Sequence, residues 1–278
     1  AAAKSAYQSD NKQGLKEVRF TSDSGYLYFL LKYNQPVDFK NEGTYLLLDT
    51  IGNQGQTTIP INQQVKINAD YGIDFLIKLQ GPNNSRILVD SYYDTFYYQY
   101  GKLLRMIPEE PYASQKNNGI FNPIRLALNK QQTIPSTKVV LPFQDYETGV
   151  LQYGSANPAS KNFNSLTDIS MSSDKKIIEG RIPWQLLNVK DPSLKEIMGD
   201  VWKQGLSGSE EASGIRAAIV TTAKGSLEQT IPKTVNGQLQ QKGSLVYNWN
   251  SWDQPPFYER LKTSYEIMKK TFGSVEAK

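Results

Sequence analysis

The sequence predicts an all-β protein, built as one β-sandwich with long loop insertions. Three observations indicate this fold class. Short apolar segments recur between turn-forming residues, several segments alternate between apolar and polar positions, and only one long stretch has the three- and four-residue spacing of an amphipathic helix. The 278 residues are enough for one large domain with a buried core. We expect the small and polar residues 1–14 to form a linker and residues 15–278 to form a single domain.

The first predicted element is a hairpin. Residues 15–22 alternate in polarity, the sequence Asp-Ser-Gly at 23–25 predicts a tight turn, and residues 26–33 are apolar on both faces. A strand that is apolar on both faces is typical of a sheet covered on both sides. We therefore expect residues 26–33 to form a central strand with protein packed on each face.

Further strands follow along the chain. Residues 44–48 are apolar, and residues 73–79 and 86–89 flank the turn sequence Gly-Pro-Asn-Asn at 81–84, which predicts a second hairpin. Residues 101–165 are interrupted by Pro, Asn, Gln and Ser, so long loops and short strands are expected there.

The later part of the chain contains two more predicted strands. Residues 175–184 alternate and end at Pro183, which places Trp184 on the core. Residues 214–222 carry small and β-branched side chains that suit a crowded sheet interior.

The C-terminal region predicts an amphipathic helix over residues 255–272, followed by Gly273 as its C-cap. Large apolar residues recur at helical spacing: Phe257, Leu261, Tyr265, Met268 and Phe272. We expect this helix to cover the domain's own sheet. The alternative is that its apolar face binds a partner or a membrane surface.

Composition excludes several classes of function. Cys and His are both absent, which rules out Cys- or His-ligated zinc, Cys–His nucleophilic catalysis and a Ser-His-Asp triad. The formal net charge of +4 is spread along the chain, so no nucleic-acid-binding surface is expected. The sequence has no apolar run of about 18 residues, so we expect no transmembrane segment. The absence of Cys is in keeping with an extracellular or cell-surface protein.

The order of segments carries a family resemblance. Residues 17–20 and 25–29 form a strand pair, residues 46–49 read Leu-Leu-Leu-Asp, and residues 179–184 form an acidic strand that closes on Pro-Trp. This order resembles the family-9-type carbohydrate-binding modules and the wider DOMON-like superfamily. The resemblance implies an immunoglobulin-like or jelly-roll β-sandwich that binds a polysaccharide or oligosaccharide. Haem-binding members exist in that superfamily, but a haem with an axial His cannot apply to a chain without His.

Two aromatic clusters are candidate sugar-binding residues, because flat rings stack on sugar faces while planar polar groups bind hydroxyls. In the first, residues 90–100 are expected to be an extended strand with rings on both sides. The second lies between residues 247 and 253, with Trp249 expected as the exposed ring and Trp252 as the anchor. The candidate ligand-binding residues are Tyr92, Tyr93, Asp94, Tyr97, Tyr98, Trp249, Asn250 and Trp252. The alternative for both clusters is structural: the first lies under the 101–165 insertion, and the second pins the C-terminal helix.

Carboxylates near predicted turns are candidate ligands for a structural Ca²⁺, which prefers six to eight oxygen atoms. These are Asp49, Asp70, Asp74 and Asp90. Calcium sites occur in the family that the chain resembles, although no segment has EF-hand spacing. The alternative is that these carboxylates are solvated turn residues.

Three function classes follow. We expect a non-catalytic carbohydrate-binding domain rather than an enzyme. The second class is a structural or protein-interaction accessory domain of a larger surface protein, bound to other domains of that chain. The third is a glycoside hydrolase or lyase that uses paired carboxylates, with Asp49, Asp94 and Glu179 as candidates.

Overall fold

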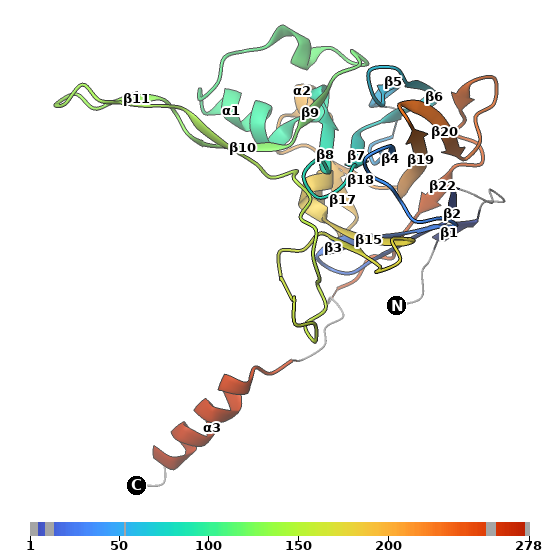
Figure 1. Ribbon diagram of the computed structural model, residues 1–278. Coiled ribbons are helices and arrows are strands. Elements are labelled where there is room, and N and C mark those ends of the chain that lie inside the picture. Colours follow the sequence, from blue (N-terminus) through green and yellow to red (C-terminus); the bar gives the residue numbers. More distant parts are fainter. Residues whose placement is uncertain (1–4, 9–13, 53, 254–259, 276–278) are drawn as a thin grey trace.

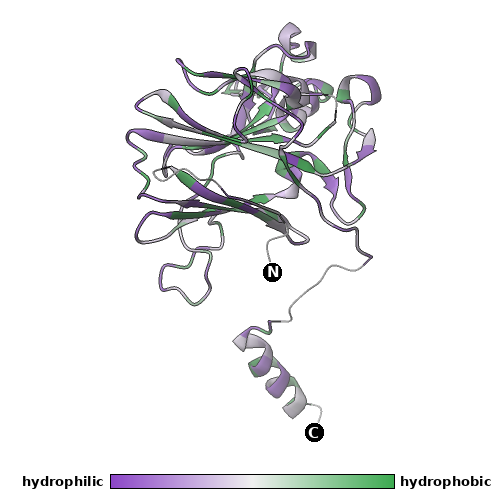
Figure 2. Ribbon diagram, turned by 90° about the vertical axis from the view of Figure 1, so that its right-hand side faces the viewer, coloured by the Kyte–Doolittle hydropathy of each residue, from purple (hydrophilic) through white to green (hydrophobic). Residues whose placement is uncertain are grey.

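The computed structural model describes residues 5–8, 14–52, 54–253 and 260–275. Two large antiparallel sheets pack face to face (Figures 1 and 2). The five-stranded sheet has the order β1 (Ser5–Gln8), β2 (Leu15–Ser22), β3 (Tyr26–Tyr33), β15 (Ile177–Pro183) and β14 (Ile169–Met171). The seven-stranded sheet has the order β20 (Ser226–Ile231), β19 (Ile215–Ala223), β4 (Glu42–Asp49), β7 (Phe75–Leu79), β8 (Arg86–Asp90) and β9 (Phe121–Pro123), with β22 (Leu245–Tyr247) also paired to β19. The predicted all-β sandwich is confirmed.

A third layer covers the other face of the seven-stranded sheet. This outer sheet consists of β21 (Gln238–Leu239), β6 (Lys66–Ile73) and β5 (Gln56–Pro60). The described residues therefore form two hydrophobic cores, one on each side of the seven-stranded sheet. A small sheet of β16 (Val189–Asp191), β17 (Glu196–Met198) and β18 (Ser209–Glu211) lies beside them.

β4 is buried on both faces, as are its neighbours β7 and β19, whereas β3 is not. In β4, Leu46 and Leu48 belong to the core shared with the five-stranded sheet, while Tyr45 and Leu47 belong to the core under the outer sheet. In β3, only alternate residues are buried, and Tyr26, Tyr28 and Leu30 are half-buried on the outer face. The prediction of a doubly covered strand at 26–33 was wrong because aromatic and aliphatic side chains also occur on a partly solvated face.

The predicted linker at 1–14 contributes a strand. Ser5–Gln8 form β1, which pairs antiparallel with β2 at the edge of the five-stranded sheet. Residues 1–4 and 9–13 lie outside the described residues.

Of the strand predicted over residues 90–100, only Asp90 is in a strand, at the end of β8, and residues 91–100 include three helical turns. They comprise η1 (Ser91–Tyr93), the π-helical turn η2 (Thr95–Gln99) and the start of α1 (Tyr100–Leu103). The carboxylates of Asp90 and Asp94 accept hydrogen bonds from the amides of Tyr92 and of Tyr97 and Tyr98, respectively. Such N-capping stabilises helical turns, and it overrides the strand preference of the tyrosines.

The stretch between residues 101 and 165 has the loops and short strands that the sequence predicts. It contains η3 (Pro111–Ser114), β9 and a ribbon that projects from the body (Figure 1). The ribbon pairs β10 (Arg125–Asn129) with β13 (Gln144–Glu147) and β11 (Gln132–Thr133) with β12 (Val140–Leu141).

Trp184 lies in the core, as predicted. It begins η4 (Trp184–Leu187), directly after β15 ends at Pro183, and its side chain is fully buried. Its indole Nε1 donates to the carbonyl of Asp23 at 2.9 Å, and its ring packs on Trp249 with centroids 4.8 Å apart.

The C-terminal helix α3 (Thr263–Val275) does not cover a sheet. The predicted helix began at residue 255, but residues 254–259 lie outside the described residues, and Gly273 is inside the helix rather than its C-cap. Every described residue from 260 to 275 is exposed, and Figure 1 shows the helix apart from the sheets. The short helix α2 (Val201–Gln204) is the other α-helix of the later part of the chain. Across the described residues, no helix is both long and apolar enough to cross a bilayer.

Candidate functional site

A cavity of about 570 Å³ lies where the ends of strands from the seven-stranded and outer sheets meet. We call it the Asp49 pocket. The charged and polar side chains that matter for its chemistry are Asp49, Asp70, Asp90, Lys116, Arg216 and Gln241. They come from six separate parts of the chain, which the sheet pairing brings together.

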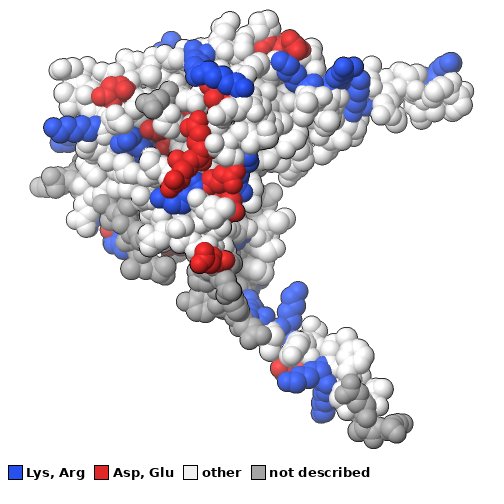
Figure 3. Space-filling model, turned by 180° about the vertical axis from the view of Figure 1, so that it is seen from behind, with Lys and Arg blue, Asp and Glu red and all other residues white. Residues whose placement is uncertain are grey.

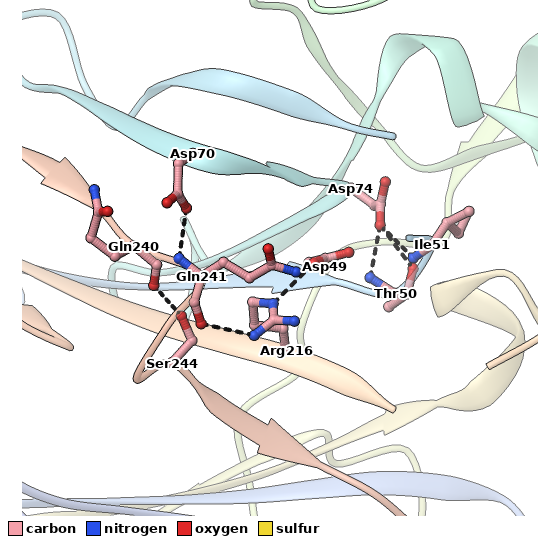
Figure 4. Close-up of polar contacts among 9 residues, drawn as sticks. All are labelled: Asp49, Thr50, Ile51, Asp70, Asp74, Arg216, Gln240, Gln241 and Ser244. Atoms are coloured by element: carbon pink, nitrogen blue, oxygen red, sulfur yellow. Dashed lines mark hydrogen bonds and ion pairs between the residues drawn. The ribbon is translucent and has the colours of Figure 1, made fainter. Parts of the chain in front are cut away.

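The centre of one wall is an ion pair between neighbouring strands. Asp49 ends β4 and faces Arg216 of β19 in the strand register, and Arg216 Nε lies 3.3 Å from Asp49 Oδ2 (Figure 4). The guanidinium also donates from Nη1 to the carbonyl of Gln241 at 3.1 Å and lies over the ring of Tyr71. Burial raises the pKa of Asp49 to about 6, although Arg216 acts in the opposite direction. These contacts fix the Arg216 side chain in one orientation.

Asp70 holds a loop against this wall. Its Oδ1 accepts a hydrogen bond from the amide of Gln241 at 2.6 Å, and Ser244 Oγ donates to the carbonyl of Gln240 at 2.6 Å (Figure 4). The Ser244 bond closes the 240–244 loop on itself, and the Asp70 bond holds the loop beside Arg216.

The opposite wall is built around Asp90, at the end of β8. Gln56 Nε2 donates to Asp90 Oδ1 at 2.6 Å, and burial raises the pKa of Asp90 to about 6. Lys116 Nζ donates to Gln54 Oε1 at 3.2 Å and lies over the ring of Tyr92. The pocket thus has acceptors and donors on both sides.

Asp74 lies behind the pocket and supports it. It is fully buried, and its Oδ2 accepts hydrogen bonds from the amides of Thr50 and Ile51 at 2.7 and 2.9 Å (Figure 4). Burial raises the pKa of this carboxyl well above its ordinary value. The contacts fix the turn that follows Asp49.

The four candidate calcium ligands are brought into this one region. Asp49, Asp70 and Asp90 line the pocket and Asp74 lies behind it. Within the part of the chain that the structure describes, no group of three or more acidic residues is arranged to hold a metal ion. Calcium binding stays a prediction.

The first aromatic cluster is mostly buried. Tyr92, Tyr93 and Tyr98 are each less than 5% exposed, and Asp94 caps a helical turn, so only Tyr92 reaches the Asp49 pocket. Tyr97 is half-buried and carries the Arg125 guanidinium over its ring, 4.2 Å from the centroid.

The second aromatic cluster lies elsewhere, and the expected roles of its tryptophans are reversed. Trp249 is 3% exposed and stacks on Tyr247, whereas Trp252 is only partly buried. Asn250 is exposed. The prediction of Trp249 as the exposed ring was wrong. Its Nε1 donates a hydrogen bond to the carbonyl of Pro192, and its ring packs on Trp184 inside the core.

The three candidate catalytic carboxylates are not brought together. Asp49 lines the pocket, Asp94 is buried at the start of η2, and Glu179 lies on the outer face of the five-stranded sheet. Sequence reasoning also missed Arg216, Lys116 and Gln241. In the sequence these three residues differ from others only in being polar residues in loops or near strand ends. That pattern does not predict which loops come together in the fold.

Comparison of the chain with protein-family models, with curated proteins and with solved structures finds no match. The resemblance to family-9-type carbohydrate-binding modules and the DOMON-like superfamily stays a prediction.

The buried carboxylates predict that stability falls as pH rises. An Asp has a pKa of about 3.9 in an unfolded chain, and the folded chain raises that of Asp90 to about 6, so the folded state binds this proton more tightly. The resulting stabilisation is present below about pH 4 and is lost as pH rises through about 6, a change of roughly 3 kcal/mol. Asp90→Asn, which cannot ionise, is expected to be more stable than the parent at pH 7.5 and to lose less stability between pH 4.5 and 7.5. Urea unfolding at these two pH values measures both quantities.

The matched control is Glu210→Gln, which removes an exposed carboxylate on β18 and is expected to leave the pH dependence unchanged. If the free energy of unfolding of Asp90→Asn changed with pH as much as that of the parent, Asp90 would ionise in the folded chain as it does in the unfolded one.

Proposed function

We propose that this chain is a non-catalytic carbohydrate-binding domain and that the Asp49 pocket is its binding site. The observation that carries the proposal is the pocket itself: a cavity of about 570 Å³ with carboxylates, amides and two cationic side chains on its walls. Small-molecule sites in proteins have volumes of roughly 300–1,000 Å³.

The chemistry of the lining matches a ligand that is rich in hydroxyl groups. Each sugar hydroxyl both donates and accepts hydrogen bonds, and the pocket offers acceptors at Asp49 and Asp70, donors at Lys116 and Arg216, and both at Gln54. Hydrogen bonds to charged groups are the stronger ones. The Arg216 side chain is already held by protein contacts, so little ordering is needed on binding.

The pocket favours the end of a glycan over a flat polysaccharide surface. Tyr71 and Tyr92 line the cavity, but they are 7% and 4% exposed, so neither presents an open ring face. Recognition therefore depends on hydrogen bonds inside a cavity. A terminal unit of one or two sugars fits this arrangement better than a long planar chain.

Calorimetric titration with a panel of oligosaccharides tests the proposal. We expect saturable binding to at least one member, with a tenfold or greater loss in Arg216→Met and in Lys116→Met, because each removes a charged donor worth about 1.5–3 kcal/mol. Lys40→Met removes an exposed charge outside the pocket and is expected to bind like the parent. Repeating the titration with Ca²⁺ and with a chelator tests the calcium prediction.

No binding to any member of the panel would favour the second class, a structural or protein-interaction accessory domain. Binding that survives both pocket variants would place the sugar elsewhere on the molecule. We propose an extracellular or cell-surface location for either class, as the sequence analysis predicts.

A carboxylate-based glycosidase is the second candidate function, and one observation favours it. Both Asp49 and Asp90 line the same cavity with a pKa that burial raises to about 6, a range suited to a general acid. Release of reducing sugar from a bound glycan, abolished in Asp90→Asn without loss of binding, would establish hydrolysis. Binding without any release would support the non-catalytic proposal.

A further inference from the structure

The C-terminal helix α3 makes no packing contact with the sheets. Every described residue from 260 to 275 is exposed, and this segment forms local hydrogen bonds, such as that from Thr271 Oγ1 to the carbonyl of Ile267 at 2.8 Å. A 13-residue helix is marginally stable in water without packing. The helix therefore needs a surface on which to bury its apolar face.

That apolar face is a narrow stripe. At 3.6 residues per turn, its members fall within an arc of roughly 80°. They are Tyr265, Met268, Phe272 and Val275, each between 46% and 66% exposed. Ile267 is the one large apolar residue of α3 that lies outside the stripe, about 120° from its centre.

The rest of the segment is basic. Arg260, Lys262, Lys269 and Lys270 carry positive charge, and Glu266 is the only acidic residue among the described positions 260–275 (Figure 3). Lys269 flanks the stripe on one side and lies over the ring of Tyr265, with its Nζ 5.9 Å from the ring centroid. Lysines in this position can extend toward charged groups while the apolar stripe is buried.

We propose that α3 binds the surface of an anionic lipid bilayer, with the stripe in the acyl boundary and the lysines among the headgroups. Charge complementarity selects this partner, because an anionic bilayer supplies both an apolar layer and negative charge along the whole helix. At 1.5 Å per residue the helix is about 20 Å long, shorter than the roughly 30 Å hydrocarbon core, so it lies in the interface. The body of the domain stays in water.

Co-sedimentation of the intact chain with vesicles tests the proposal. We expect binding to vesicles of phosphatidylcholine with 30% phosphatidylglycerol, at least about tenfold weaker binding to pure phosphatidylcholine, and release by 0.5 M salt. Reversing two charges in Lys269→Glu/Lys270→Glu is expected to lower partitioning by about 25-fold or more. Phe272→Ser is also expected to lower it strongly, whereas Ile267→Ser, a similar apolar-to-polar change outside the stripe, is expected to bind like the parent.

A second measurement reports which side of the helix enters the bilayer. Because the chain has no Cys, a single Phe272→Cys or Ile267→Cys variant can carry one environment-sensitive fluorophore. The label at 272 is expected to shift to the blue with anionic vesicles, and the label at 267 is not. Equal shifts at both positions, or no preference for anionic lipid, would overturn the proposal.

Two further results would contradict it and identify another occupant. A blue-shifted label at 272 in a lipid-free monomer would mean that the helix packs on its own domain. The same shift accompanied by a doubled mass in solution would mean that two copies pair through the stripe.

Discussion

Gly72→Ala is expected to destabilise the chain by about 3 kcal/mol or more, which corresponds to a fall in Tm of roughly 6–12 °C. Gly72 lies in β6, and a methyl group there would overlap the backbone carbonyl of Gln54, which no side-chain movement can relieve. The loop that carries Gln54 must shift, and this loop is one wall of the Asp49 pocket. Ligand binding is therefore expected to weaken together with stability, and urea unfolding and calorimetric titration measure the two effects.

Gly52→Ala is the matched control for this prediction. Gly52 also lines the pocket, but a methyl group at Gly52 meets no atom within 4 Å. Gly52→Ala is expected to leave the free energies of unfolding and of ligand binding within about 0.5 kcal/mol of the parent's values. If Gly72→Ala also stayed within this range, the backbone of the Gln54 loop would have to move without loss of stability, and the prediction would be wrong.

Trp184→Ala is expected to lower the free energy of unfolding by about 3–5 kcal/mol. Trp184 is fully buried, packs on Trp249 and donates a hydrogen bond to the carbonyl of Asp23, so its loss leaves a large cavity in the core between the two main sheets. Unfolding in urea followed by far-ultraviolet circular dichroism measures the change.

Trp184→Phe separates packing from hydrogen bonding at the same position. It retains an aromatic ring but cannot donate to Asp23, and we expect it to have roughly half the effect of the alanine variant or less. A loss of unfolding free energy below 1 kcal/mol in Trp184→Ala would contradict the prediction that this side chain is a major part of the core between the two main sheets.

The sequence predicted the sandwich because local polarity patterns record which strand faces are buried. Residues 44–48, 175–184 and 214–222 correspond to β4, β15 and β19, and the hairpin expected around the turn at 81–84 is β7–β8. What local patterns do not record is which sheet receives a second covering layer. The outer sheet covers β4 rather than β3, and this depends on the pairing of β6 with β21, which is far from the β5–β6 hairpin in the chain.

The site was harder to predict than the fold for the same reason. Asp49, Asp70 and Asp90 were recognisable as strand-end carboxylates, and the structure places them around one pocket. Their partner Arg216 is 167 residues from Asp49, and only the register of β19 against β4 brings the two together. At residues 90–100 the count of aromatic side chains suggested a strand, whereas the capping carboxylates of Asp90 and Asp94 determined the local backbone.

The burial of β4 on both faces has a consequence for how the protein unfolds. Its alternate side chains belong to two cores, so detaching either covering sheet leaves one face of the same strand in water. The three layers are therefore expected to melt as one cooperative unit rather than layer by layer. A ligand bound at the end of β4 would add its binding free energy to that single transition, so occupancy of the pocket would protect every layer at once.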